Sequence, residues 1–161
     1  MKKYLKNEKL GLTGMVRAVL RNTKTGKVRI IPWNYNTIMT VGKTAVLNRL
    51  GNIAAVSNEG IITYGAVGNG STTPSISNTQ MENELARNTL AKTSVSSTKL
   101  TIQVFFAEAL ANDTITKFAL FGEDASASAD SGTMFNYAIF SDSFTKTAIE
   151  TLTVEIKFTL S

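Results

Sequence analysis

The sequence contains neither cysteine nor histidine. Without thiols, the chain forms no disulfide, no zinc–thiolate site and no cysteine nucleophile. Without imidazole, it lacks the commonest general base and the commonest nitrogen ligand for a metal. Catalysis on this chain would have to use carboxylates, lysine, tyrosine, serine or threonine alone.

Long apolar runs are also missing. No stretch approaches the roughly 20 apolar residues of a membrane-spanning helix, so we expect no membrane insertion. The N-terminal run MKKYLKNEKLGL is basic, but no apolar segment of about 7–15 residues follows it, which argues against a secretory signal. With 161 residues and 43% hydrophobic content, the chain is long enough for one domain with a buried core.

Acidic residues are nearly absent from the first part of the chain. Residues 1–50 contain eleven lysines and arginines against Glu8 alone, a net charge of +10, whereas residues 51–161 carry six basic and eleven acidic side chains, or −5. Such a split favours attraction to an acidic neighbour, to a second copy, to nucleic acid or to a membrane surface. A basic face that meets only solvent is the alternative.

The apolar patterns that the sequence does contain predict mainly β-strands. Residues 15–32 predict a hairpin with a turn from Asn22 to Gly26 and a second strand that ends at Pro32. In residues 151–160 every even position is apolar and every odd one polar, which is typical of a half-buried antiparallel strand. Shorter patterns predict further strands at 61–67, 99–108, 114–121 and 133–140. We therefore expect a mainly β fold, an antiparallel β-sandwich or jelly-roll-like domain.

Two short helices are expected within this fold. The first covers about residues 40–50, with Val41, Ala45 and the pair Leu47 and Leu50 on the face that packs on the core. The second covers about residues 79–87, where Thr79 and Glu82 have the spacing of a capping box. On that second helix, Glu84 and Arg87 are three residues apart and are expected to form an ion pair.

The expected domain organisation is simple. Residues 1–12 carry five charges and little apolar content, which predicts a basic, flexible N-terminal arm. Residues 13–161 predict one β-sandwich domain. The run GEDASASADSG, residues 122–132, predicts a polar and acidic surface loop.

No residue pattern predicts catalysis, a cofactor or a metal. Gly65, Gly68 and Gly70 lack the following Lys-Ser/Thr of a phosphate loop and are better explained as turn glycines. The acidic residues of 122–132 lack the ligand spacing of a calcium loop, so a weak cation site is the minor alternative to a solvated loop. We expect a protein that is not an enzyme.

Nucleic acid is a partner that the basic residues leave open but do not favour. Arg17, Arg21, Lys27 and Arg29, together with the aromatic pair at Trp33 and Tyr35, are the residue types of a phosphate-binding surface with base stacking. No homeodomain, zinc-finger, RRM or KH signature accompanies them.

One stretch carries a family resemblance. Residues 64–87, YGAVGNGSTTPSISNTQMENELAR, resemble a pattern in small virion proteins of tailed bacteriophages: a strand ending in an Ala-x-Gly-x-Gly turn, then Thr/Ser-Thr-x-Pro, a spaced Thr, and Leu-x-x-Glu-x-x-Arg. Met81 stands where that pattern has leucine, a change that conserves packing. The runs ITKFALFGEDA, SGTMFNYAIF and KTAIETLTVEIKFTL resemble later strands of the same family in the same order.

The resemblance implies a bacteriophage structural protein of β-sandwich fold without enzymatic activity. Its implied place is the virion, after synthesis in the host cytoplasm, as a tail, baseplate or fibre-associated component. The alternatives are a capsid head-decoration or head-fibre protein, a receptor- or glycan-binding tip, and a DNA-contacting protein. The expected partners are other virion proteins, of the tail or baseplate or the major capsid protein, and further copies in a homo-oligomer. The candidate interface residues are Lys2, Lys3, Lys6, Lys9, Arg17, Arg21, Arg29, Trp33, Tyr35, Glu84 and Arg87.

Overall fold

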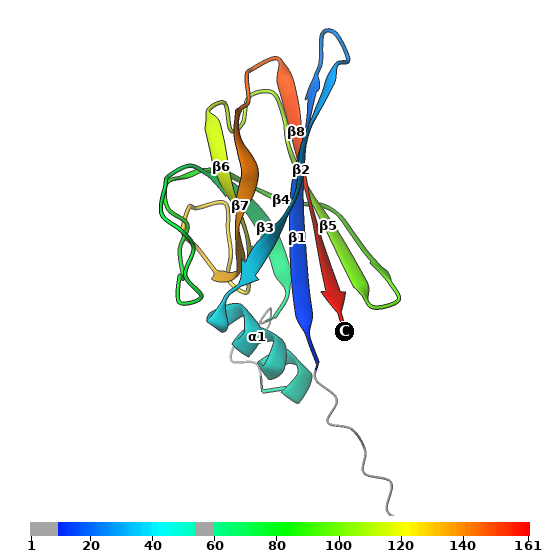
Figure 1. Ribbon diagram of the computed structural model, residues 1–161. Coiled ribbons are helices and arrows are strands. Elements are labelled where there is room, and N and C mark those ends of the chain that lie inside the picture. Colours follow the sequence, from blue (N-terminus) through cyan, green and yellow to red (C-terminus); the bar gives the residue numbers. More distant parts are fainter. Residues whose placement is uncertain (1–9, 54–59) are drawn as a thin grey trace, which may run out of the picture.

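The protein folds as an antiparallel β-barrel with a helix at one end (Figure 1). The structure is a computed structural model that describes residues 10–53 and 60–161. The elements within those ranges are β1 (Leu12–Asn22), β2 (Val28–Ile38), α1 (Thr40–Gly51), β3 (Ile62–Gly68), β4 (Glu84–Ser96), β5 (Lys99–Phe106), β6 (Thr114–Gly122), β7 (Thr133–Thr145) and β8 (Glu150–Leu160).

The mainly β, antiparallel prediction is confirmed, but the sandwich arrangement is wrong. The strands close into one ring in the order β1-β2-β7-β6-β3-β4-β5-β8. Alternating apolar residues place every second side chain on a buried face in a sandwich and in a barrel alike. The pattern within each strand therefore could not distinguish two packed sheets from one sheet closed on itself.

The shortest ladder of the ring joins β2 and β7, which pair through Asn36, Thr37 and Ile38. Pro32 lies within β2 and does not end it, contrary to the prediction. The register of the β1–β2 pair shifts between Val16 and Ala18, opposite this proline, and the β7 ladder begins only at Asn36. The backbone nitrogen of residue 32 therefore donates no hydrogen bond to either neighbouring ladder, and proline is tolerated there.

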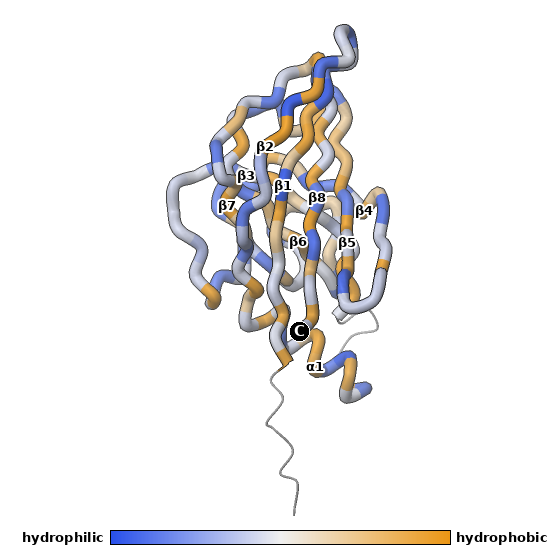
Figure 2. Tube along the Cα trace, turned by 45° about the vertical axis from the view of Figure 1, so that its right-hand side comes forward, coloured by the Kyte–Doolittle hydropathy of each residue, from blue (hydrophilic) through white to orange (hydrophobic). Residues whose placement is uncertain are grey.

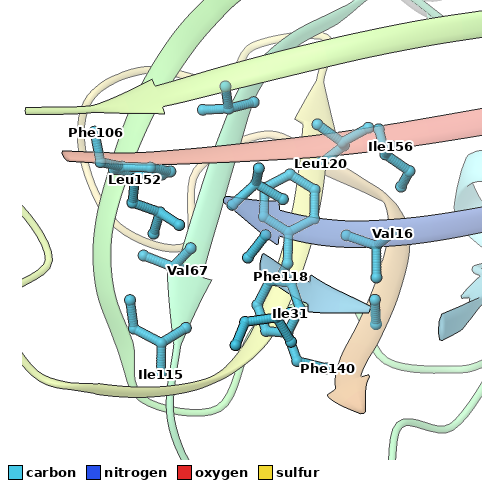
Figure 3. Packing of buried hydrophobic residues seen from close by; sticks show 14 of the residues in the cluster. Val16, Ile31, Val67, Phe106, Ile115, Phe118, Leu120, Phe140, Leu152 and Ile156 are labelled. Atoms are coloured by element: carbon cyan, nitrogen blue, oxygen red, sulfur yellow. The ribbon is translucent and has the colours of Figure 1, made fainter. Parts of the chain in front are cut away.

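The barrel interior is filled by large side chains from all around the ring (Figure 3). Phe118 of β6 is fully buried at its centre. A Cβ on Gly65 of β3 would lie 2.5 Å from Val104 Cγ2 and 3.1 Å from the Phe118 ring. Gly65 therefore provides the space that Phe118 occupies.

A second apolar cluster lies on the outside of the barrel wall. Alternate residues of β3, β6 and β7 that point away from the barrel interior, among them Phe121, Met134 and Tyr137, pack with Met81 from the loop before β4. Both faces of β6 are consequently buried, which explains why its sequence is apolar at every position from Phe118 to Phe121.

The predicted helix at 79–87 is wrong. Residues 79–83 belong to the loop that covers the outer cluster, and β4 begins at Glu84. Glu82, the expected helix-capping residue, instead accepts hydrogen bonds from Thr72 and pairs with Lys117 of β6. These long-range partners replace the local ones that a capping box would supply.

The ion pair expected between Glu84 and Arg87 does form, although the two residues lie in a strand. Residues three apart in a regular strand point to opposite faces. Here Gly68 pairs with Glu84 and Val67 with Ala86, so Leu85 is an extra residue in β4. This bulge brings both charged side chains to the same face of the sheet.

The helix predicted at about 40–50 is confirmed as α1, but part of its predicted core face is wrong. Gly42 and Ala45 are buried, whereas Leu47 and Leu50 are exposed. A Cβ on Gly42 would lie only 2.5 Å from the carbonyl oxygen of Phe135, so α1 approaches the β7 backbone through its glycine. This approach leaves Leu50 about a third of a turn and Leu47 about half a turn away from the face of Gly42 and Ala45.

Candidate functional site

The barrel end that carries α1 has an apolar groove. It has a volume of about 410 Å³ and is lined by Leu10, Leu12, Lys43, Val46, Leu47, Leu50 and Leu160. A second depression of about 300 Å³ shares Leu12, Val46 and Leu160 with it and extends to the β4–β5 turn at Val95. We refer to the seven residues of the first depression as the end groove.

The leucines of the end groove are strongly exposed. Leu10 is 77% accessible, Leu47 65% and Leu50 75%, and Val95, which lines the adjoining depression, reaches 73%. Apolar side chains that are exposed singly are normal on protein surfaces, whereas a contiguous group of this kind marks an interaction site. The end groove is therefore the strongest candidate for a functional surface.

Tertiary structure assembles the end groove from distant parts of the sequence. β1 and β8 pair in register through Leu12 and Leu160, which places the first and last strands side by side. The helix α1 lies at the same end, beside the start of β1 and the C-terminus (Figures 1 and 2). The sequence predicted Leu47 and Leu50 to face the core, so it did not indicate them as surface residues.

The opposite end of the barrel is closed by polar contacts. Lys146, between β7 and β8, is almost fully buried, and its Nζ donates to Asn112 Oδ1 at 2.8 Å and to the Glu108 carbonyl at 3.1 Å. Burial lowers the pKa of Lys146, and the charges of Glu150 and Glu108 partly offset this. The two ends thus differ in character, and the apolar one is open.

The charged side chains that line the end groove and its extension are basic. Lys43 of α1 lines the groove, and Lys99 lines the depression beside it. Among the described residues that line these two depressions, none is acidic. The Lys-rich sequence of residues 1–9 directly precedes Leu10; Lys2, Lys3, Lys6 and Lys9 themselves lie outside the described residues.

Several predicted interface residues lie on the outer face of β1, β2 and β8, away from α1. The Trp33 ring packs under two cations, Arg17 at 4.8 Å and Lys157 at 4.6 Å. Glu155 bridges both, at 3.3 Å from Arg17 and 3.4 Å from Lys157. The structure brings Arg17 and Trp33 together, but their charge and ring face are engaged within the chain.

The remaining basic and aromatic candidates are dispersed over β1 and β2. Arg29 donates to the Thr145 carbonyl at 2.7 Å and lies 3.5 Å from Glu150, thereby bridging β2 to the β7–β8 connection. Arg21 is exposed near the end of β1, and Tyr35 on β2 is also exposed.

Glu84 and Arg87 are buried rather than presented to a partner. Their side chains are 4% and 3% exposed, and Arg87 also donates to the carbonyls of Ser126 and Ser131. The Arg87 guanidinium lies over the Phe121 ring at 4.5 Å. This network fixes the acidic loop of residues 123–132 against the outer face of the barrel wall.

Lys117 anchors the other covering loop. Its side chain is buried, and Nζ donates to the Thr72 carbonyl at 2.7 Å and to the Glu82 carboxylate. The hydrogen bond from Lys117, followed by those from Thr72, holds the pKa of Glu82 below its usual value. Burial acts to raise the pKa of Glu155, but Gln103, Arg17 and Lys157 together lower it.

These lowered carboxylate pKa values predict loss of stability in acid. The stabilisation is fully present above the unfolded-state pKa of about 4.5 and is lost as the pH falls through the lower folded-state values. We expect the melting temperature to fall steeply below about pH 4.5. A Glu82→Gln variant should melt lower than the wild type at pH 7 and show a shallower decline in acid. Thermal unfolding followed by circular dichroism from pH 7 to pH 3 checks this; parallel pH profiles would contradict it.

In residues 10–53 and 60–161, no group of three acidic, histidine or cysteine side chains is placed to hold a metal ion. No helix within the same ranges has the length and apolar character needed to cross a bilayer.

No family model matches the chain, and neither a curated protein nor a solved structure does.

Proposed function

We propose that this protein is a non-enzymatic structural component that assembles through protein–protein contacts made by the end groove. In line with the resemblance of residues 64–87 to tailed-phage proteins, we propose the virion as its location, as a tail, baseplate or fibre-associated part. A head-decoration or head-fibre role is the second candidate, and it would use the same surface.

The observation that carries this proposal is the exposure of the end-groove leucines. Two loops, anchored by Lys117 and Arg87, cover the outer cluster and bury it. It leaves Leu47 and Leu50 open on a helix that is otherwise anchored to the barrel. Burying one leucine side chain contributes roughly 1.5–3 kcal/mol, so covering several of them supplies a substantial part of an interface energy.

The charge of the region supports contact with an acidic neighbour. Lys43 lies in the groove, and residues 1–9, which precede Leu10, hold four lysines against one glutamate. Complementary charge increases the rate of encounter and selects among partners more than it adds affinity. In this arrangement the leucines supply the binding energy and the lysines the selectivity.

A Leu50→Glu substitution is expected to reduce incorporation into phage particles at least about tenfold, because each buried charge opposes apolar contact by several kcal/mol. The measurement is mass-spectrometric quantification of the protein in particles purified from a host that produces either variant. Unfolding in urea should be unchanged, since Leu50 is exposed.

The matched control is Ile30→Glu, which changes an aliphatic residue of similar exposure on β2, outside the end groove. It should be incorporated like the wild type. Equal incorporation of Leu50→Glu and wild type would remove the end groove from the assembly. Absence of the wild-type protein from particles would remove the virion role.

A further inference from the structure

We infer that the end groove receives an amphipathic helix of another protein, with an apolar stripe in the groove and acidic side chains along its flanks. This inference rests on the proposed function and specifies the partner of the same surface. It is carried by the periodicity of the exposed residues on α1, by the chemistry of the lining and by its charge.

The exposed stripe on α1 has helical spacing. Lys43, Leu47 and Leu50 are exposed at positions i, i+4 and i+7, which form one face along two turns. Val46, at i+3, borders this face and packs against the barrel core, on the side where Gly42 and Ala45 are buried. A helix with apolar residues on both faces is one that packs on two partners. Among residues 10–53 and 60–161, the barrel covers the first face, and Leu47 and Leu50 on the second stay exposed.

The lining chemistry favours a helix over an extended segment as occupant. Apart from Lys43, the side chains of the end groove are aliphatic and carry no hydrogen-bonding group. An extended segment laid against them would leave backbone N–H and C=O groups facing apolar side chains, at a cost of about 1–3 kcal/mol each. A helix satisfies these groups internally and presents only side chains.

Charge selects another protein rather than a second copy. A two-fold contact through the end groove would place Lys43 of one chain near Lys43 of the other, with Lys99 at the border of both. Facing like charges oppose association, whereas glutamates or aspartates on the flanks of the occupant would pair with these lysines. The occupant is therefore apolar at its centre and acidic at its edges.

Three synthetic peptides test this inference against the full-length protein. The first is a peptide of about 18 residues, long enough to be helical, with leucines at i, i+3, i+4 and i+7 and glutamates on the flanks. The second replaces each glutamate with lysine. The third keeps the acidic composition but has two central prolines, which prevent helix formation. Binding is measured by fluorescence anisotropy at low salt and at physiological salt.

We expect the acidic helix to bind at least about tenfold more tightly than the basic helix at low salt, with a smaller ratio at higher salt. The proline peptide should bind at least about tenfold more weakly than the acidic helix. Binding should be lost in Leu47→Glu and retained in the Ile30→Glu control. Equal binding of acidic and basic helices overturns the acidic partner, and equal binding of the proline peptide overturns the helix.

Failure of all three peptides to bind would overturn the inference as a whole. The proposed function has a separate readout, because particle incorporation of Leu50→Glu is measured without any peptide. Loss of incorporation together with absent peptide binding would leave the end groove as an assembly surface with a different occupant. Normal incorporation of Leu50→Glu would remove the end groove from the assembly, and absence of the wild-type protein from particles would remove the virion role.

Discussion

Replacing Arg87 with alanine is expected to lower the free energy of unfolding by about 3–5 kcal/mol, because the Glu84 carboxylate is then buried without its partner. Both side chains are at most 4% exposed, and their atoms approach to 2.6 Å. The substitution also removes the donors to the carbonyls of Ser126 and Ser131, so the loop of residues 123–132 should become accessible to proteases. Urea denaturation with a constant m value measures the loss.

Two control variants test whether the cost of Arg87→Ala comes from leaving a buried charge without its partner. Arg29→Ala removes a partly exposed ion pair with Glu150 and should cost only about 0–1 kcal/mol. Replacing Glu84 and Arg87 together with methionine should recover most of the loss, because no unpaired charge remains in the sheet. A cost of Arg87→Ala no larger than that of Arg29→Ala would show that the pair is solvated, contrary to its burial.

Phe118→Ala is expected to cost about 3–5 kcal/mol through the cavity that it leaves at the centre of the barrel. Phe118 is fully buried, whereas Phe105 on β5 is 40% exposed and serves as the control. Phe105→Ala should cost much less, because most of its lost contact area was already in water. Equal costs at the two positions would contradict the closed barrel with a filled interior.

Gly65 tests the same packing from β3, the strand that pairs with β6. Gly65→Ala should cost about 1–3 kcal/mol by overpacking, since its methyl group would meet Val104 and Phe118. In a Phe118→Leu background that clash is reduced, so the two changes should be non-additive by about 0.5–3 kcal/mol. Additive costs would place Gly65 away from the Phe118 ring.

Local patterns in the sequence were reliable for seven of the eight strands and for one helix, whereas β4 was not predicted as a strand. The even-position apolar residues of 151–160 predicted β8 correctly. The turn after Asn22 also lies where expected, and Asn22 Oδ1 accepts hydrogen bonds from the backbone N–H groups of Lys24 and Thr25. Such patterns succeed because side-chain alternation and turn chemistry depend on neighbours along the chain.

The pattern at 79–87 failed for the opposite reason. Thr79 and Glu82 are three residues apart, as are Glu84 and Arg87, which is a helical spacing. Glu82 and Arg87 nevertheless bind groups far away in the sequence, Lys117 and the loop at Ser131. A bulge at Leu85 then reproduces an i, i+3 ion pair inside a strand. Spacing alone could not distinguish these two geometries.

The sequence by itself determined that the protein is β-rich, that it lacks thiol and imidazole chemistry, and that its first part is basic. Only the tertiary structure decided that the sheet closes into a barrel, because closure depends on which strands meet. It also decided the candidate site. Gly42 approaches the β7 backbone so closely that α1 turns Leu47 and Leu50 outward, beside Leu12 and Leu160 from the paired first and last strands. Exposure of an apolar residue is a property of packing, so no local pattern could have assigned it.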